Sequence, residues 1–425
     1  MKLISSLSLF SSLLAITLSA ADGFDIALPP SYPAEPPVGD PWSGLRVFDV
    51  NDYGGVADGK TNNSLALMAA WEDACYHQGG SMLLIPEGNY FVDQVTFSGP
   101  CFNDLSPKVL ILGTLIAPTN LTADVWIHFD SLRRLSLTAG HLSTLDGRGA
   151  QTWSSGSRCR HAMTCAMFAI SLKLSNVLNG TVSSINLVDS KAFHVSIHQC
   201  DNIHLSGFNI TAPWYSQNTD GFHISQSTNI SITNSKIGVG DDCVSIGPGS
   251  VNVLVSNVTC GPGHGISIGS LGRYKMENDV RGIWVENCTI SGTQNGVRVK
   301  TWPGDHASNA TNLTFQNIVM INVSNPIIID QQYCPNSSCD SRESSSVKLS
   351  DINIRNISGT YNSEFAINMK CSSTKACENI RLSYINLTSI NHQSDDDEDE
   401  EEGDVTGNFN FKGALNSFTI FNSTF

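Results

Sequence analysis

Residues 192–269 contain four short segments of similar sequence: AFHVS (192–196), GFHIS (221–225), CVSIG (243–247) and GISIG (265–269). Two more, GVRVK and PIIID, follow at 296–300 and 326–330. Each is rich in β-branched or aromatic side chains and is flanked by glycine, asparagine or proline, which is typical of a short strand between turns. No helical periodicity interrupts the series, so strand follows strand along the chain.

A second repeat runs through the same region and consists of an asparagine followed by an aliphatic residue. It occurs at 176, 202, 229 and 252, at intervals of 26, 27 and 23 residues, and again at 312 and 379. Several short strands in every repeat of about 25 residues leave no room for a crossover helix. The two repeats predict an all-β fold, a right-handed parallel β-helix, in which each coil adds one strand to each sheet and the asparagines stack in the turns.

A solenoid exposes strand edges at its ends and needs caps there. The segment Ser64–His77 (SLALMAAWEDACYH) follows two asparagines and precedes Gly79-Gly80. These start and stop signals predict an amphipathic helix, and we expect it to close the first coil. The C-terminal end carries no comparable signal.

The N-terminus has the pattern of a secretory signal peptide. A single basic residue, Lys2, precedes an apolar run from Leu3 to Leu18 and small residues up to position 21. The run is too short to span a bilayer comfortably, and no later segment approaches about 20 continuous apolar residues. We therefore predict a protein secreted to the extracellular space or cell wall, with no membrane partner, a signal peptide at 1–21 and one β-helix domain at 22–425.

The chain has 12 cysteines, an even number that suits an oxidising compartment. Three pairs are close in sequence, and we expect them to form local disulfides: 159 with 165, 334 with 339, and 371 with 377. Zinc binding is the alternative, but no CxxC doublet or HExxH pattern supports it. Sequons such as those at 120, 209, 257, 312 and 386 allow several glycans, although some of these asparagines should belong to the stack instead.

The net charge of −15 would repel a polyanion, so we predict no nucleic-acid partner. Eight of these charges form an acidic run at 395–402, and removing them leaves −7. Such a block is typical of a solvated loop, here 395–404, with calcium binding as the alternative. An anionic substrate must therefore meet a local cluster of basic residues.

Candidate site residues emerge when the strands between 192 and 330 are aligned. The residue before each strand is, in order, Lys191, Asp220, Asp242, His264, Asn295 and Asn325. Neighbouring strands of a sheet lie about 4.8 Å apart. Two carboxylates and an imidazole should therefore line up along three consecutive coils.

Asp241 and Asp242 are adjacent, and adjacent residues of a regular strand point to opposite faces. Both can serve one site only if they lie in a turn or at a strand end, which Gly238 and Gly240 favour.

Arg298 and Lys300 come later in the same series of coils. Their period-two spacing sends both side chains to the same face, and we expect that face to be the outer one because Val297 and Val299 should point to the core.

Nothing about folding requires carboxylates on adjacent strands, because they repel one another. Two kinds of chemistry suit the cluster. In glycoside hydrolysis, one carboxyl donates a proton and another activates water, while Arg298 and Lys300 hold a sugar carboxylate. In a lyase reaction, calcium bound by aspartates acidifies C5 of the sugar and a base removes its proton.

At these residues the sequence resembles the polygalacturonases of glycoside hydrolase family 28, most closely those of plants. Four motifs carry the resemblance in the same order, with a tyrosine after them: Asn218-Thr-Asp220-Gly221, Gly240-Asp-Asp242, Gly263-His-Gly265, Arg298-Val-Lys300 and then Tyr333. The similarity extends from Phe48 to Thr388. It implies a right-handed parallel β-helix that hydrolyses with inversion and needs no metal or other cofactor. The acidic run and the ending at 422–425 depart from the family pattern and put the last coil in doubt.

The resemblance also implies a role for each site residue. Asp241 looks like the general acid, Asp220 and Asp242 resemble the pair that activates water, and His264 resembles the residue that sets the protonation of the acid. Arg298 and Lys300 resemble the subsite for a galacturonate carboxylate, and Tyr333 and Asn218 line the same cleft. Crowding of three carboxylates should raise at least one pKa, and an inverting acid and base should stand about 6.5–9.5 Å apart.

The expected substrate is polygalacturonate or pectin, cut within the chain by a monomeric enzyme. Three alternatives stay open: an exo-acting enzyme that removes terminal units, a hydrolase of the rhamnogalacturonan backbone, and a non-catalytic β-helix that binds pectin. Arg298 and Lys300 favour galacturonate at the cutting site, and the aspartates favour catalysis over binding alone.

Overall fold

The computed structural model describes residues 44–154, 168–335, 339, 343–391, 405–406, 409–413 and 415–421. The chain divides by its internal contacts into Met1–Ala34 and Glu35–Phe425, and the description below concerns the second unit. The predicted signal peptide and the acidic loop at 395–404 lie outside the described residues, as do Cys159 and Cys165.

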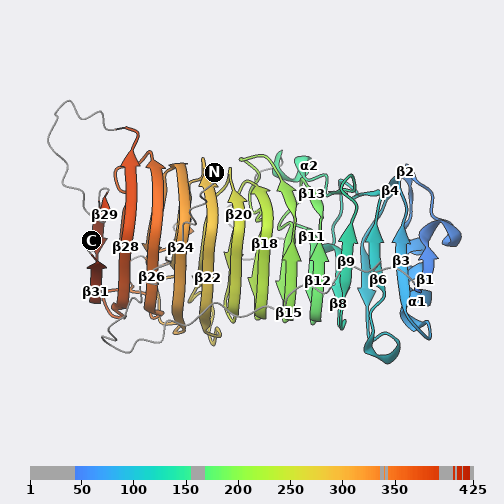
Figure 1. Cartoon of the computed structure of the whole chain (residues 1–425), viewed down its shortest axis with the longest axis horizontal. Helices are drawn as coiled ribbons and strands as arrows, with labels where there is room; N and C mark the ends of the chain where they lie inside the picture. The colour runs from blue at the N-terminus through green and yellow to red at the C-terminus, as the bar shows by residue number, and fades with distance from the viewer. Residues whose placement is uncertain are drawn as a thin grey trace, which may run out of the picture. The chain divides into compact units, whose positions relative to one another are not determined.

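The described residues form two parallel sheets that share successive coils of a solenoid (Figure 1). The broad sheet has 20 strands: β1 (Arg46–Asp49), β2 (Asp58–Asn62), β3 (Ser81–Ile85), β4 (Asn89–Phe91), β6 (Lys108–Ile111), β7 (Thr114–Ile116), β9 (Ser136–Ala139), β10 (Leu145–Asp146), β12 (Leu178–Ser183), β13 (Asn186–Val188), β15 (Asp201–Ser206), β16 (Asn209–Thr211), β18 (Thr228–Gly238), β20 (Val251–Cys260), β22 (Val280–Ser291), β24 (Asn309–Val323), β26 (Lys348–Tyr361), β28 (Cys377–Ser389), β29 (Val405–Thr406) and β31 (Leu415–Phe421).

The short sheet has 11 strands: β5 (Val95–Ser98), β8 (Val125–Asp130), β11 (Ile170–Ser175), β14 (Val195–His198), β17 (Phe222–Ser225), β19 (Val244–Ile246), β21 (Ile266–Leu271), β23 (Asn295–Thr301), β25 (Asn325–Asp330), β27 (Ile367–Lys370) and β30 (Phe409–Lys412). Four short helices complete the described part: η1 (Val50–Tyr53), α1 (Ser64–Tyr76), η2 (Phe102–Asp104) and α2 (Ala150–Ser154). The predicted right-handed parallel β-helix is confirmed.

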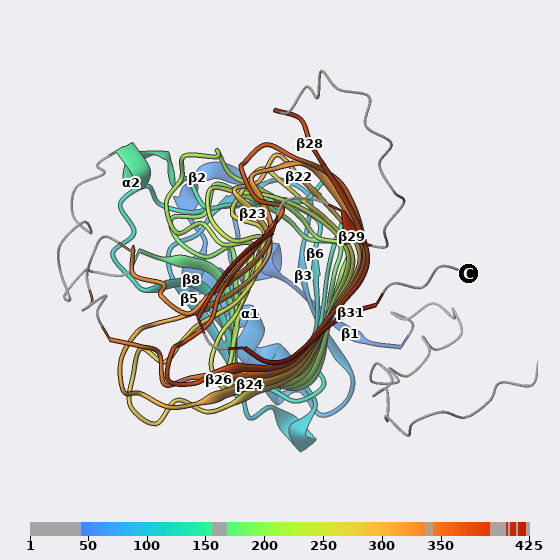
Figure 2. The same cartoon turned by 90° about the vertical axis from the view of Figure 1, so that its left-hand side faces the viewer.

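Inward-facing side chains of the short sheet stack rung on rung. Phe222 pairs with Val244, which pairs with Ile266, and the row continues through Val297 and Ile327. All five are at most 2 % exposed. Each such burial stabilises the fold by about 1.5–3 kcal/mol, so this row holds neighbouring coils in register. Figure 2 shows the coils superposed along the solenoid.

The register of β14 differs from the sequence alignment by two residues. Val195 pairs with Phe222, and Ser196 with His223, whereas we had aligned Val195 with Ile224. Lys191 therefore does not occupy the column of Asp220. The error has a physical cause, because alternation has a period of two and a two-residue slip leaves the inward and outward faces unchanged.

The predicted capping helix is confirmed as α1, which lies against β1, β3 and β5 at the N-terminal end (Figure 1). Its buried Trp71 packs against Phe97 and Phe129, at ring centroid distances of 5.1 and 6.1 Å. A disulfide joins Cys75, in its last turn, to Cys101. At the other end β30 pairs with β27 and β31 with β28, so both sheets continue beyond the acidic run, which the departures from the family pattern had put in doubt.

Asparagines stack between coils as predicted. The Asn252 side chain donates to Asn229 at 3.2 Å, and that of Asn257 donates to Asn234 at 2.7 Å in a second row. All four have a positive φ of 51–56°, a conformation that asparagine tolerates better than most residues. Asn257 belongs to one of the sequons, so this asparagine has a structural role of its own.

The local disulfides Cys334–Cys339 and Cys371–Cys377 are confirmed. Cys243 pairs with Cys260, a bridge that we had not predicted. Within the described part of the chain, Cys200 and Cys288 are buried free thiols. No helix in this part is both long and apolar enough to cross a membrane.

Candidate active site

The turn between β18 and β19 carries two adjacent carboxylates to one site, as the sequence predicted. Residues 239–243 lie outside both strands, so Asp241 and Asp242 are free of the alternation of a regular strand. A Cβ atom at Gly240 would lie 2.0 Å from the carbonyl oxygen of Ser216, so only glycine fits this close approach. The disulfide of Cys243 holds the far side of the turn.

Asp242 is 1 % exposed and accepts hydrogen bonds from three side chains. The Arg298 Nη2 atom lies 3.0 Å from its Oδ1 and the Lys300 Nζ atom 2.6 Å from its Oδ2, while Ser267 donates to Oδ1 at 2.8 Å. Burial opposes ionisation of this carboxyl, but Lys300 and Arg298 outweigh it and lower its pKa to about 2. Asp242 is therefore a carboxylate at any pH near neutrality.

Asp220 lies one coil before Asp242 and is 6 % exposed. Its Oδ2 accepts a hydrogen bond of 2.7 Å from Ser245. Burial, together with the charges of Asp241 and Asp242, raises the pKa of Asp220 well above its usual range. The prediction that crowding raises at least one pKa is confirmed, and Asp220 is the residue concerned.

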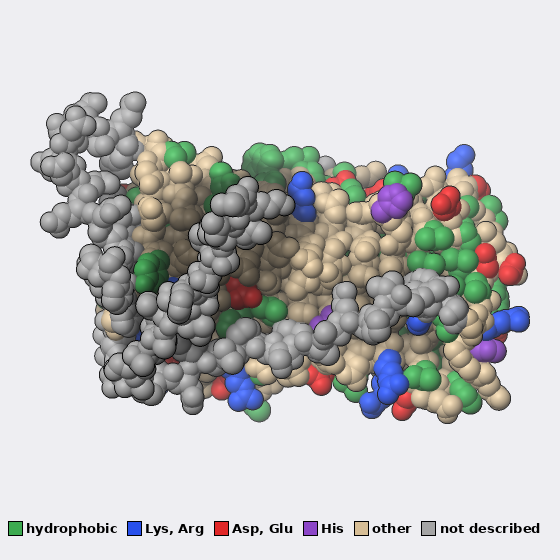
Figure 3. Space-filling model, viewed as in Figure 1, with side chains coloured by type: hydrophobic (Ala, Val, Ile, Leu, Met, Phe, Trp, Pro, Cys, Tyr) green, Lys and Arg blue, Asp and Glu red, His purple; other side chains and the backbone are tan. Residues whose placement is uncertain are grey.

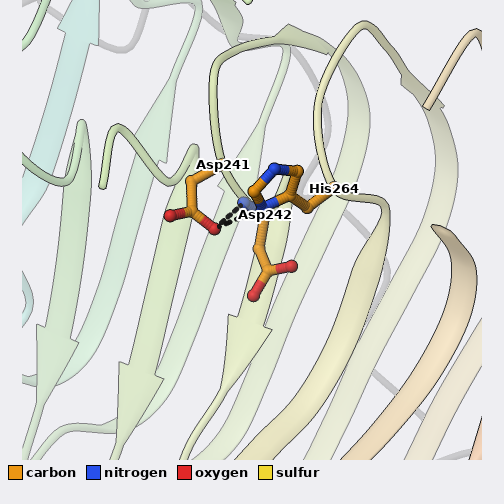
Figure 4. A group of neighbouring side chains, drawn as sticks. All are labelled: Asp241, Asp242 and His264. Carbon is orange, nitrogen blue, oxygen red and sulfur yellow. Dashed lines mark hydrogen bonds and ion pairs between the residues drawn. The ribbon is translucent and has the colours of Figure 1, made fainter. Parts of the chain in front are cut away.

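Asp241 is the most accessible of the three, with a side chain 20 % exposed. The His264 ring contacts its Oδ1 through Nδ1 at 3.0 Å, and the backbone N–H of Asp242 donates to the same oxygen at 2.9 Å. Asn218 donates to Oδ2 at 3.3 Å. Figure 4 shows the Asp241 carboxyl turned toward His264, whereas the Asp242 side chain points along the sheet.

Tyr333 lies over the two cations of the site. The Arg298 guanidinium carbon is 5.8 Å and the Lys300 Nζ atom 5.4 Å from its ring centroid, and its ring meets that of Trp302 edge-on at 5.6 Å. The structure thus brings together all eight residues predicted for the site: Asn218, Asp220, Asp241, Asp242, His264, Arg298, Lys300 and Tyr333.

Sequence reasoning missed Ser245 and Ser267. Each stands on the coil after an aspartate and donates to its carboxylate. The signal was available, since both occupy the outward-facing middle position of the segments CVSIG and GISIG.

One atom each of Asp241, Asp242 and His264 lie within 4.8 Å of one another, a spacing that could hold a metal ion. However, Arg298 and Lys300 already pair with Asp242, and their charges oppose a divalent cation at that carboxylate. The nearest carboxylate oxygens of Asp241 and Asp242 are closer to each other than the roughly 6.5–9.5 Å that most inverting glycosidases leave between their two carboxyl groups to admit water. This approach concerns the nearest oxygen atoms, so the separation between acid and base carboxyl groups stays a prediction.

Basic side chains are scattered over the described surface in Figure 3, and no broad basic face appears in that view. The cations that could meet an anionic substrate are instead held next to the aspartates. The arrangement can protonate a leaving group, activate water and bind a carboxylate within one site.

The sequence matches the family model of glycosyl hydrolases family 28 over residues 75–400. It is 45 % identical over 345 residues to an exopolygalacturonase of Platanus acerifolia, covering 80 % of this chain and 90 % of that protein. It is 40 % identical over 345 residues to a polygalacturonase of Gossypium barbadense, covering 80 % and 84 %. Among solved structures, the endo-xylogalacturonan hydrolase of Aspergillus tubingensis superposes with a TM-score of 0.72 at 23 % identity, covering 87 % of this chain and all of that one.

Proposed function

This chain belongs to glycosyl hydrolases family 28, and we propose that it is a polygalacturonase, which hydrolyses the α-1,4 bonds between galacturonate units of pectin. The observation that carries the proposal is the position of Asp242. It is a buried carboxylate fixed by Arg298 and Lys300, next to the more accessible carboxyl of Asp241. A hydrolase of an acidic polysaccharide needs both a proton relay and a cationic subsite, and here the two adjoin.

We assign the general acid to Asp241. Of the three carboxyls it has the greatest exposure, so it can reach the glycosidic oxygen of a bound chain. His264 contacts the same carboxyl and would hold its orientation. In the reaction, Asp241 gives its proton to the leaving oxygen as the bond from that oxygen to C1 breaks.

We assign the activation of water to Asp220 and Asp242. The raised pKa of Asp220 makes it the stronger base of the two once it is ionised. Asp242 stays ionised and would orient the water. The proton of the water passes to Asp220 while its oxygen bonds to C1, with inversion at that carbon.

Arg298 and Lys300 would hold the carboxylate of a galacturonate unit beside the cut bond. Both already donate to Asp242, but a guanidinium has five N–H donors and an ammonium three, so each can serve a second carboxylate. Tyr333 covers both cations and would offer its ring to the sugar, and Asn218, which donates to Asp241, would line the same cleft.

From the sequence we expect endo-action, a cut within the polymer chain, with exo-action as the alternative. We propose exo-action, the removal of terminal galacturonate, because the relative that is 45 % identical carries the name exopolygalacturonase. The relative at 40 % identity is named without a mode of attack. The proposed site of action is the cell wall, which the disulfides of the described region suit, since such bonds persist in an oxidising compartment.

Product sizing on de-esterified polygalacturonate tests the proposal. We expect new reducing ends, with free galacturonate as the earliest product and a slow fall in viscosity. Oligomers of intermediate length at early times would contradict exo-action and favour endo-action. Activity on rhamnogalacturonan with none on polygalacturonate would overturn the polygalacturonase assignment.

A further inference from the structure

The loop between β21 and β22 places a cation near the site that the proposed mechanism does not use. Arg273 is exposed, and its guanidinium carbon lies 4.9 Å from the Trp302 ring centroid and 5.3 Å from that of Tyr274. Among the described residues, no carboxylate forms an ion pair with it. Its charge is therefore available to a ligand.

The backbone around Arg273 is fixed in place. The carboxylate of Glu277 accepts hydrogen bonds from the N–H groups of Gly272, Arg273 and Tyr274, at 2.6, 3.0 and 2.8 Å. His306 donates from Nδ1 to the carbonyl oxygen of Arg273 at 3.1 Å. The Glu277 carboxylate is thus used to close the loop and does not pair with the Arg273 guanidinium, and the backbone from which that side chain extends is held in place.

Two aromatic rings connect Arg273 to the cations of the site. Its guanidinium lies over Trp302, the edge of Trp302 meets Tyr333, and Arg298 and Lys300 lie over Tyr333. Trp302 is only 8 % exposed, so the ring is a fixed support. Arg273 is therefore connected to the cations of the site through two ring contacts in succession.

The three cations differ in their partners. Arg298 and Lys300 share Asp242, whereas Arg273 has two ring contacts and no acidic partner in the described part of the chain. Polygalacturonate carries one carboxylate on every unit, so a unit held at Arg298 and Lys300 brings others nearby. A guanidinium is well suited to bind a carboxylate through two parallel hydrogen bonds.

We propose that Arg273 forms a second carboxylate subsite, which binds an unesterified galacturonate unit next to the cutting site and makes the enzyme prefer de-esterified pectin. The inference rests on the proposed polygalacturonase function and extends it to a residue with no part in the chemical steps. A methyl ester at that unit removes the charge that Arg273 would meet, so binding there weakens.

Affinity measurements in an inactive background test the subsite. In an Asp241→Asn protein, calorimetry compares binding of polygalacturonate with binding of a partly methyl-esterified pectin, with and without Arg273→Gln. We expect Arg273→Gln to lower the affinity for polygalacturonate about fivefold, as for one partly exposed charged contact, and to reduce the preference over the ester by a similar factor. Lys275→Gln is the matched control, because it removes the same charge from an exposed position of the same loop and should leave the preference unchanged.

An equal loss of affinity for both polymers would overturn the proposal, since a merely structural role of Arg273 does not distinguish acid from ester. The same effect from Lys275→Gln would overturn it too, because it would show a general effect of loop charge. Turnover of polygalacturonate by the unsubstituted enzyme decides the proposed function separately. If turnover is absent, the binding comparison still decides whether Arg273 recognises a uronate carboxylate.

Discussion

Replacing Lys300 by methionine tests the electrostatic core of the site most directly. Lys300 Nζ lies 2.6 Å from Asp242, and both side chains are under 10 % exposed. Methionine keeps an unbranched apolar side chain but removes the charge, so the buried carboxylate of Asp242 is left with Arg298 as its one ion-pair partner among the described residues. Removing one partner of a buried pair costs about 3–5 kcal/mol because the other charge stays buried.

The pKa of Asp242 gives a second measure of the effect. Its folded pKa of about 2 lies below the usual value of about 3.9 for an aspartate, which corresponds to roughly 2–3 kcal/mol at about 1.4 kcal/mol per unit. Because this folded pKa is depressed, its contribution is present above the unfolded pKa of about 3.9 and is lost as pH falls through about 2. The free energy from this pKa shift includes the effects of Arg298 and Ser267, which the variant keeps. From the loss of the Lys300 partner we expect Lys300→Met to destabilise the protein by about 3 kcal/mol at pH 7.

The predicted loss depends on pH. Lys300 is the largest of the causes that lower the pKa of Asp242, so that pKa rises without it, and the variant protonates Asp242 at a pH where the parent protein still holds it ionised. The difference in free energy of unfolding should therefore shrink as pH falls from 7 toward 3. Lys300 also lowers the pKa of Asp220, so the acid limb of kcat/KM should move to higher pH in the variant.

Urea unfolding at several pH values measures the first effect and a pH profile of residual activity the second. Lys348→Met is the control, since it breaks the exposed ion pair with Glu378 and should cost at most about 1 kcal/mol at any pH. A loss for Lys300→Met that is the same at pH 3 and pH 7 would refute the reasoning, because it would show lost packing and not lost charge. A loss no larger than that of the control would refute it as well.

Three further predictions follow from the same geometry. Asp241→Asn should lower kcat about 100- to 10,000-fold, as expected for a general acid, while calorimetry shows unchanged binding of polygalacturonate; retained turnover would remove Asp241 from its role. Asp220→Asn should abolish most activity yet make the protein more stable in urea at pH 7, because the folded pKa of Asp220 is raised and this carboxyl therefore costs stability as pH rises above its unfolded pKa of about 3.9; a less stable variant would contradict the burial argument. Replacing Cys75 and Cys101 together by serine removes a disulfide between residues 26 apart in sequence. The variant should lose about 3 kcal/mol of stability, measured as a lower urea midpoint. An unchanged midpoint would mean that side-chain packing alone keeps α1 in place over the first coil.

Much of this protein could be predicted from local sequence. Alternation and coil length fixed the parallel β-helix, and a shared position before each strand placed Asp220, Asp242 and His264 in one column, as their strands confirm. The outward direction of Arg298 and Lys300 followed from the buried Val297 and Val299. These inferences succeed because each depends only on a pattern in the sequence: the alternation of residues within one strand, or the same position repeated from coil to coil.

The tertiary structure alone decided the register of β14, because a two-residue slip preserves alternation and only the contacts between coils select one pairing. It also decided which groups pair. Asp242 takes both cations, while Ser245 and Ser267 reach the aspartates from the next coil. The rise in the pKa of Asp220 likewise comes from burial among side chains of several coils. Sequence spacing thus determined which residues could meet, and the energies of burial and charge between coils determined what each of them can do.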